Sequence, residues 1–219
     1  PIFSPDGSKL IWESMERDGY EADKNRLFLM DMASREKKDL TASFDHNIAS
    51  PVWDREKPYI WFVSNVSATE QIHAIDLQTG EITKVTEGMQ DFVQVLNAGD
   101  ILIAVRMSIS SPSEIYSIDL ASGTATNISN INTPVLSQLT LGDVEERWVK
   151  TTDGKDMLVW VIYPPHFDPS KKYPAILYCQ GGPQSGVSQF WSLRWNFQMM
   201  AANGYVVIAP NRRGLPGFG

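Results

Sequence analysis

Short apolar runs recur along residues 1 to about 130 and are separated by turns rich in Ser, Pro, Asp and Gly. Their length and alternation predict β-strands rather than helices. The clearest runs are 10–13, 26–31, 59–63, 71–77, 101–105 and 114–120. Asp31, Asp76 and Asp119 occupy equivalent places, 45 (76 − 31) and 43 (119 − 76) residues apart. A period near 40–45 residues with about four short strands per unit predicts β-propeller blades.

The repeat is too short to close a ring. About three units are present, whereas a propeller needs at least about four blades. We therefore expect residues 1–140 to form a partial propeller of about three blades, with the missing blades lying before Pro1. The alternative is a small free-standing sandwich. It is disfavoured because stacked repeats need their neighbours to bury a core.

The period is lost near Leu141, after a polar stretch that contains Pro134. The expected elements of residues 141–219 are a hairpin of strands 145–150 and 157–163, a strand at 175–177, a helix over 193–202 and a strand at 205–210. This order is typical of the first part of an α/β-hydrolase sheet. The predicted fold is thus β plus α/β, in two domains divided near residue 140.

The strand at 175–177 runs into Gln180-Gly181-Gly182-Pro183. Paired glycines leave backbone N–H groups open to a ligand oxygen, and Pro183 fixes the next turn. In the α/β-hydrolase architecture, the loop at this place supplies one of the two donors of an oxyanion hole. Taken alone, the motif fits an ordinary turn equally well.

Composition narrows the partners. The formal charge is −7 and no Lys/Arg cluster occurs, which argues against nucleic acid. No apolar run reaches the length of a membrane span. The single cysteine, Cys179, excludes a disulfide within the chain. His46 and His73 share no ligand spacing, so we expect no metal and no cofactor, and His73 is interpreted as a core or pocket-wall residue.

Three features in this order resemble the prolyl oligopeptidase family of serine peptidases. They are TolB-like repeats that lead directly into the hydrolase hairpin, the Gln180–Pro183 loop, and residues 211–219. This last stretch is similar to the family's Asn-Pro-Arg-Gly-Ser-x-Gly-Tyr-Gly loop, with Arg212 in place of the proline. Within the family, the second half looks most like the bacterial dipeptidyl-peptidase branch.

The resemblance implies roles for four residues. The Gly182 N–H is expected to be an oxyanion donor, and Gly181 keeps the approach clear. Gln180 either donates through its amide or braces the loop, and bracing is favoured. Arg213 is expected to support the neighbouring loop through an ion pair. Trp191 and Trp195 are expected in the core. The adjacent Glu145 and Glu146 point to opposite faces of a strand, so they are interpreted as surface charges.

The function implied is that of a serine exopeptidase that releases N-terminal dipeptides from oligopeptides through an acyl-enzyme. The nucleophile elbow Gly-x-Ser-x-Gly is absent from the sequence. We therefore expect a fragment that is inactive alone and needs the rest of its own polypeptide. Alternatives are an acylaminoacyl-peptidase or esterase of the same family, or a non-catalytic propeller scaffold. The resemblance implies a periplasmic or secreted protein, with the cytoplasm as alternative. The oligomeric state is left open.

Overall fold

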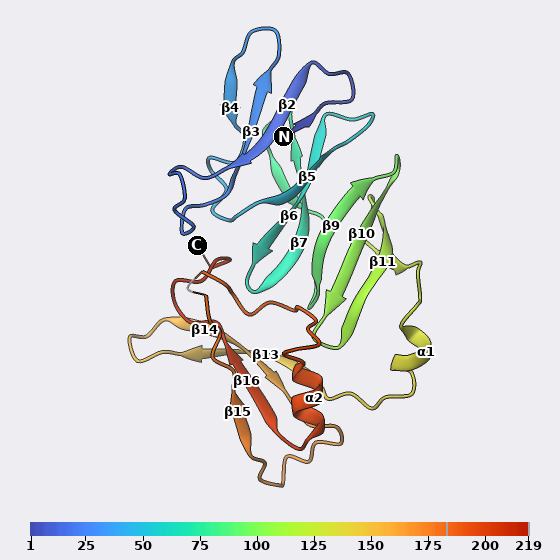
Figure 1. The fold of residues 1–219 in the computed structure, drawn as a ribbon, viewed down its shortest axis with the longest axis vertical. Helices are drawn as coiled ribbons and strands as arrows, with labels where there is room; N and C mark the ends of the chain where they lie inside the picture. The colour runs from blue at the N-terminus through green and yellow to red at the C-terminus, as the bar shows by residue number, and fades with distance from the viewer. Residues whose placement is uncertain (183, 219) are drawn as a thin grey trace.

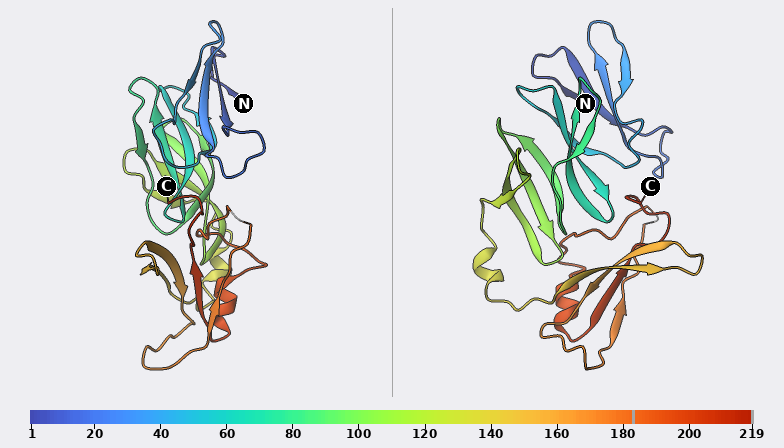
Figure 2. Two further views of the ribbon diagram at one scale, coloured as in Figure 1. Left: turned by 90° about the vertical axis from the view of Figure 1, so that its left-hand side faces the viewer. Right: turned by 180° about the vertical axis from the view of Figure 1, so that it is seen from behind.

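The computed structural model describes residues 1–182 and 184–218. Pro183, expected to fix the turn after the glycine pair, and Gly219, the end of the predicted loop motif, lie outside the described residues. The chain forms two units that lie one above the other along the long axis of the molecule (Figure 1). Residues near the C-terminus lie between the two units in each view (Figure 2).

The first unit consists of antiparallel meanders of four strands each (Figure 1). Their strands are β1 Ile2–Phe3, β2 Lys9–Ser14, β3 Arg26–Asp31 and β4 Lys37–Asp39; β5 Ala49–Trp53, β6 Tyr59–Val66, β7 Thr69–Asp76 and β8 Ile82–Lys84; and β9 Asp91–Asn97, β10 Ile101–Ser108, β11 Ser111–Asp119 and β12 Ala125–Asn127. A parallel bridge between Glu70 and Asp91 joins the second and third meanders into one eight-stranded sheet.

The periodic aspartates end the third strand of each meander and build its last turn. Asp76 Oδ1 accepts a hydrogen bond from the Gln78 N–H at 2.7 Å, and its carbonyl oxygen accepts one from the Gly80 N–H at 2.8 Å. Asp31 and Asp119 accept the corresponding side-chain and backbone bonds in their own turns. A short side chain that bonds the backbone two residues on is the reason Asp is suited to this place.

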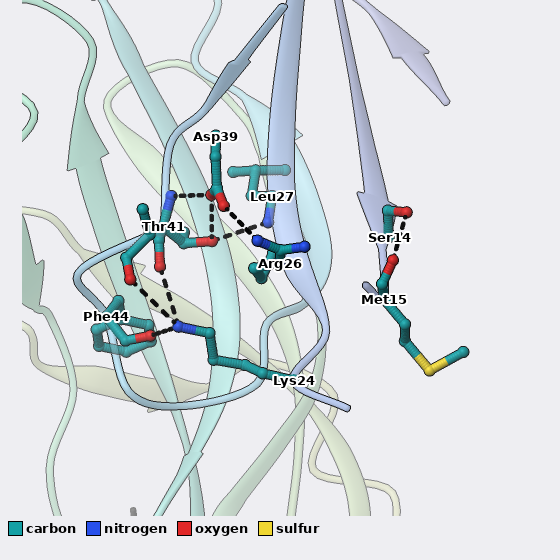
Figure 3. A network of polar contacts seen from close by, with 9 residues as sticks. Ser14, Met15, Lys24, Arg26, Leu27, Asp39, Thr41 and Phe44 are labelled. Carbon is teal, nitrogen blue, oxygen red and sulfur yellow. Dashed lines mark hydrogen bonds and ion pairs between the residues drawn. The ribbon is translucent and has the colours of Figure 1, made fainter. Parts of the chain in front are cut away.

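The loop between the first two meanders is fastened by a network of polar contacts (Figure 3). Lys24 Nζ donates to the carbonyl oxygens of Thr41 at 3.3 Å and Phe44 at 2.6 Å. Thr41 Oγ1 accepts from the Leu27 N–H at 2.9 Å, and Asp39 Oδ1 accepts from the Thr41 N–H at 2.9 Å. These bonds fix residues 39–44 to the start of β3 and to the residues before it.

The second unit is a four-stranded mixed sheet in the order β13-β14-β16-β15. Its elements are β13 Val144–Lys150, β14 Asp156–Ile162, β15 Ala175–Leu177, α2 Phe197–Ala202 and β16 Val206–Pro210, and α1 Thr133–Leu136 lies in the connection from the first unit. β15 runs parallel to β16, whereas β14 is antiparallel to it. The predicted hairpin and the two later strands are confirmed. Glu145 and Glu146 are exposed, as expected.

The predicted helix over 193–202 is wrong in its first turn. Asn196 has an extended backbone, and its side-chain oxygen accepts a hydrogen bond from the Met199 N–H at 2.9 Å. This N-cap starts the helix at Phe197, because the cap replaces the helical bond that Met199 would otherwise lack. The four-residue helix α1 was not predicted. Neither α1 nor α2, the helices of the described part of the chain, is long and apolar enough to cross a membrane.

Two hairpin tips of the first unit are buried in the core of the second. Ala68, between β6 and β7, and Ile109, between β10 and β11, are 1% and 2% exposed. Both belong to the apolar cluster that contains Trp160, Phe197 and Val207. The two units therefore share one core at their junction, and this core holds them in a fixed relation.

We predict that Arg35→Gly stabilises the protein. Arg35 has φ +63° at the turn position where the next two meanders have Gly80 at +77° and Gly123 at +69°. A side chain in this left-handed region is strained, whereas Gly is not, although Gly also gives the unfolded chain more freedom. The net gain should be about 0.5–1 kcal/mol in the free energy of unfolding, measured by urea denaturation. Arg55→Gly, at an exposed turn residue without a positive φ, is the control and should destabilise.

Candidate functional site

The glycine pair lies in an exposed turn, separated from the end of β15 by Tyr178, Cys179 and Gln180. The Tyr178 N–H donates to the Ile208 carbonyl at 2.8 Å, which fixes the start of the loop on β16. Gly182 has φ +57° and is exposed, and its carbonyl accepts from the Ser185 N–H at 3.0 Å. Within residues 1–182 and 184–218, the N–H groups of Gly181 and Gly182 donate to no backbone oxygen. Both glycines are exposed, so a ligand can approach this turn.

The turn borders a cleft of about 780 Å³. Gln180 and both glycines line one part of it, and the rest is mostly apolar, lined by Ile176, Leu177, Tyr178, Phe190, Trp195 and Met200 among others. The expectation that Trp195 is a core residue is wrong, since this residue is 46% exposed. The helix begins after Trp195, so this ring stays at the cleft, where it meets Tyr178 edge-on at 6.3 Å between ring centroids.

The residues that follow the glycine turn are tied to the second unit through Val187. Its N–H donates to Asn211 Oδ1 at 2.7 Å, and its carbonyl accepts from Asn211 Nδ2 at 3.0 Å and from Trp160 Nε1 at 2.9 Å. Asn211 is buried and comes directly after β16. The first residue of the predicted 211–219 loop thus fastens the glycine loop to the sheet. The sequence comparison with the family motif did not reveal this role.

Of the other two predicted site residues, Gln180 lies at the cleft and Arg213 lies away from it. Gln180 lines the cleft, and in the described part of the chain its side-chain amide makes no hydrogen bond. Arg213 forms an ion pair with Asp153, in the turn between β13 and β14, and its side chain is 68% exposed. Hydrogen bonds from Thr151 and then from Arg213 lower the pKa of Asp153. Arg213 does not line the cleft.

A buried carboxylate of the first unit holds the far end of the glycine loop. Asp91, 1% exposed, accepts from the Glu70 N–H at 3.0 Å and from Ser188 Oγ at 2.6 Å. The backbone N–H of Gln189 also faces this carboxylate and lowers its pKa. Nothing in the sequence signals this contact, because Asp91 and Ser188 are 97 positions apart and belong to no common motif.

Burial shifts both carboxyl groups at this junction. It raises the pKa of Asp91 to about 6, against the hydrogen bonds from Ser188, Glu70 and Gln189. It raises the pKa of Glu70 to about 7, helped by the charge of Asp91 and opposed by a hydrogen bond from Asn65 Nδ2 at 2.7 Å. Glu70 borders a cavity of about 310 Å³ that Ser185 and Gly186 line from the second unit.

The described residues contain no group of three or more His, Cys, Asp or Glu side chains arranged to hold a metal ion. His73 is 4% exposed and stacks on Phe62 with ring centroids 5.6 Å apart. Burial lowers the pKa of His73 to about 4, so the ring is neutral at physiological pH. Its position agrees with the prediction of a core residue.

Comparison with known proteins shows which peptidases this chain is similar to. No family model matches the chain. It is 47% identical over 219 residues to dipeptidyl-peptidase 5 of Porphyromonas gingivalis and 51% identical over 221 residues to that of Porphyromonas endodontalis. The whole chain is similar to dipeptidyl-peptidase 5 proteins. The predicted resemblance to the dipeptidyl-peptidase branch is thereby confirmed. The matches cover all of this chain but only 32% of each relative, so the chain spans about a third of their length.

Solved peptidase structures share the fold. An acylaminoacyl peptidase of Pyrococcus horikoshii superposes with a TM-score of 0.81 at 20% identity, over 98% of this chain and 32% of its own. Dipeptidyl peptidase 4 of Porphyromonas gingivalis gives a TM-score of 0.69 at 21% identity, over 98% and 30%. The three meanders and the mixed sheet therefore share the fold of these peptidases.

We predict that Glu70 makes the chain less stable as pH rises. The unfolded chain loses the Glu70 proton near the ordinary pKa of 4.5, whereas the folded chain keeps it until the pKa of about 7. The free energy of unfolding should therefore fall across this window and stay low above it. Glu70→Gln keeps the acceptor for Asn65 and removes the charge. This variant should be more stable at pH 8 by on the order of 2–3 kcal/mol, and little different at pH 4.

Urea denaturation between pH 4 and pH 8 measures this difference. The control is Glu56→Gln, an exposed carboxylate in the same meander, which should follow the wild type at every pH. A Glu70→Gln profile that falls as steeply as that of the wild type would contradict the prediction.

Proposed function

We propose that this chain is part of a serine exopeptidase that releases N-terminal dipeptides from oligopeptides, and that it contributes one donor of the oxyanion hole. The observation that carries the proposal is Gly182, an exposed residue in the loop after β15 that lines the cleft and whose N–H bonds no backbone oxygen among the described residues. The similarity of all of this chain to about a third of proteins named dipeptidyl-peptidase 5 supports the substrate class.

The chemistry that this turn supports is acyl transfer. Attack on a peptide carbonyl turns its oxygen into an oxyanion, and a fixed N–H donor stabilises the charge that develops in the transition state. Loss of one such donor costs about 3–4 kcal/mol of activation free energy. The nucleophile and its base come from residues outside this sequence, which holds no Gly-x-Ser-x-Gly elbow. The chain's own part is to hold the donor still and to border the cleft.

The architecture proposed for the whole protein is a propeller over an α/β-hydrolase domain. In this proposal each meander is a blade, and the mixed sheet is the first part of the hydrolase sheet. The third meander, β9 to β12, supports further blades, because several of its apolar residues are exposed among the described residues. Leu96, Ile101, Ile115 and Ile128 are 54%, 38%, 43% and 52% exposed. A second blade stacked on this face would bury them.

Assays of the parent polypeptide test the proposed function. Chromogenic substrates with a free N-terminal dipeptide should be cleaved, and acylated aminoacyl substrates should be cleaved much more slowly. The reverse preference would favour the acylaminoacyl-peptidase, and cleavage of neither would favour a binding scaffold. The 219-residue chain alone should cleave neither, and turnover by this chain would show that the nucleophile lies within it.

We predict that Gly182→Ala lowers kcat of the parent enzyme. A Cβ at Gly182 has room, with Ser185 Oγ the nearest atom at 3.6 Å, but φ +57° strains any residue other than Gly. The turn should relax and move the donor, which costs about tenfold or more in kcat. Gly204→Ala is the matched control, since Gly204 has φ +87° and open space around its Cα but lies away from the cleft.

Both variants should lose comparable stability, measured by thermal unfolding, and only Gly182→Ala should lose kcat. An equal loss of kcat in the two variants would show that stability alone explains the effect. An unchanged kcat for Gly182→Ala would remove Gly182 from the site.

A further inference from the structure

The glycine turn touches little besides itself. Within residues 1–182 and 184–218, its backbone makes one hydrogen bond, from the Ser185 N–H to the Gly182 carbonyl. Its position therefore depends on where the loop is fastened. The near end is fixed where Tyr178 joins β16, and the far end is fixed at residues 187–189.

The far end has anchors from both units. Val187 is held by Asn211 and Trp160 of the second unit, whereas Ser188 is held by Asp91 of the first. Asp91 opens β9 and also accepts the Glu70 N–H, so its carboxylate is fixed in the sheet before it meets the loop. The nearest cationic side chain along the neighbouring strand is Arg106, which lies over the Tyr116 ring at 4.5 Å.

We propose that Asp91 is a positioning residue for the glycine turn, through its hydrogen bond to Ser188. The carboxylate does not touch the cleft, so it acts on the donor at Gly182 only by fixing the end of the loop. A short bond from a hydroxyl to a buried carboxylate is among the stronger hydrogen bonds in proteins, and its loss frees one side of the loop. This proposal rests on the proposed function for its kinetic consequence, but not for its structural one.

A structural measurement tests the position of the loop directly. In the parent polypeptide, Cys179→Ser combined with Ser185→Cys places one exposed thiol inside the loop, to which a trifluoromethyl group is attached, and the parent without Ser185→Cys identifies its resonance. In this background, Asp91→Asn and Ser188→Ala should each shift or split the ¹⁹F resonance. Asp54→Asn is the matched control. Asp54 is a buried carboxylate that accepts from Glu56, Lys57, Trp61 and Asn97, all in the first unit, and its loss should leave the ¹⁹F line in place.

A kinetic measurement in the parent enzyme tests the consequence. Asp91→Asn and Ser188→Ala should each lower kcat about tenfold, with KM changed less than about threefold, because the donor acts mainly in the transition state. The double variant should be no slower than the slower single one, since Ser188→Ala removes the hydroxyl of the same bond that Asp91→Asn weakens by removing the charge and one acceptor oxygen. Asp54→Asn should lower the melting temperature and leave kcat unchanged.

The outcomes are separable. If wild-type parent cleaves no dipeptidyl substrate, the proposed function fails and the ¹⁹F arm alone decides the role of Asp91. If Asp91→Asn does not fold, Ser188→Ala decides, because it removes only a hydroxyl. Folded variants whose ¹⁹F line and kcat match those of Asp54→Asn would overturn the proposal.

Discussion

The structure depends on the burial of two hairpin tips from one unit inside the apolar core of the other. Ala68 and Ile109 contact the cluster around Trp160, which is fully buried. Burying an isoleucine side chain contributes roughly 1.5–3 kcal/mol, more than a typical hydrogen bond between neutral groups. The apolar core therefore contributes most of the stability of the junction, and polar contacts such as that of Asp91 with Ser188 set the orientation of the two units.

Much of the architecture follows from local patterns in the sequence. The spacing of Asp31, Asp76 and Asp119 predicted the repeated strands, because each aspartate builds its turn from its own neighbours. The strand before the glycine pair was predicted for the same reason, since an apolar run and a Gly-Gly turn are both short-range signals. What these residues do depends little on the rest of the chain, so the sequence alone is sufficient to place them.

Features that depend on packing between distant residues could not be predicted. The bond between Asp91 and Ser188 needs the two units to be placed first. The tight turn at Ser67 and Ala68 has φ +49° and +58°, yet it lacks the Asn-Gly pair that such turns favour. Ala68 occupies this place because its methyl group lies in the core of the other unit, which offsets the strain. The start of α2 at Phe197 was also missed. It is set by the N-cap at Asn196, and the hydrophobic pattern did not distinguish this cap from a residue inside the helix.

The connection between the units is tied at both of its ends. Glu114 accepts the N–H groups of Ile131 and Asn132 at the start, and Gln198 bonds both the N–H and the carbonyl of Gly142 at the finish. Residues 133–140, between these two sets of hydrogen bonds, are mostly exposed. This segment can therefore vary in length during evolution. Extra residues inserted there would extend into solvent and leave the geometry of the junction unchanged.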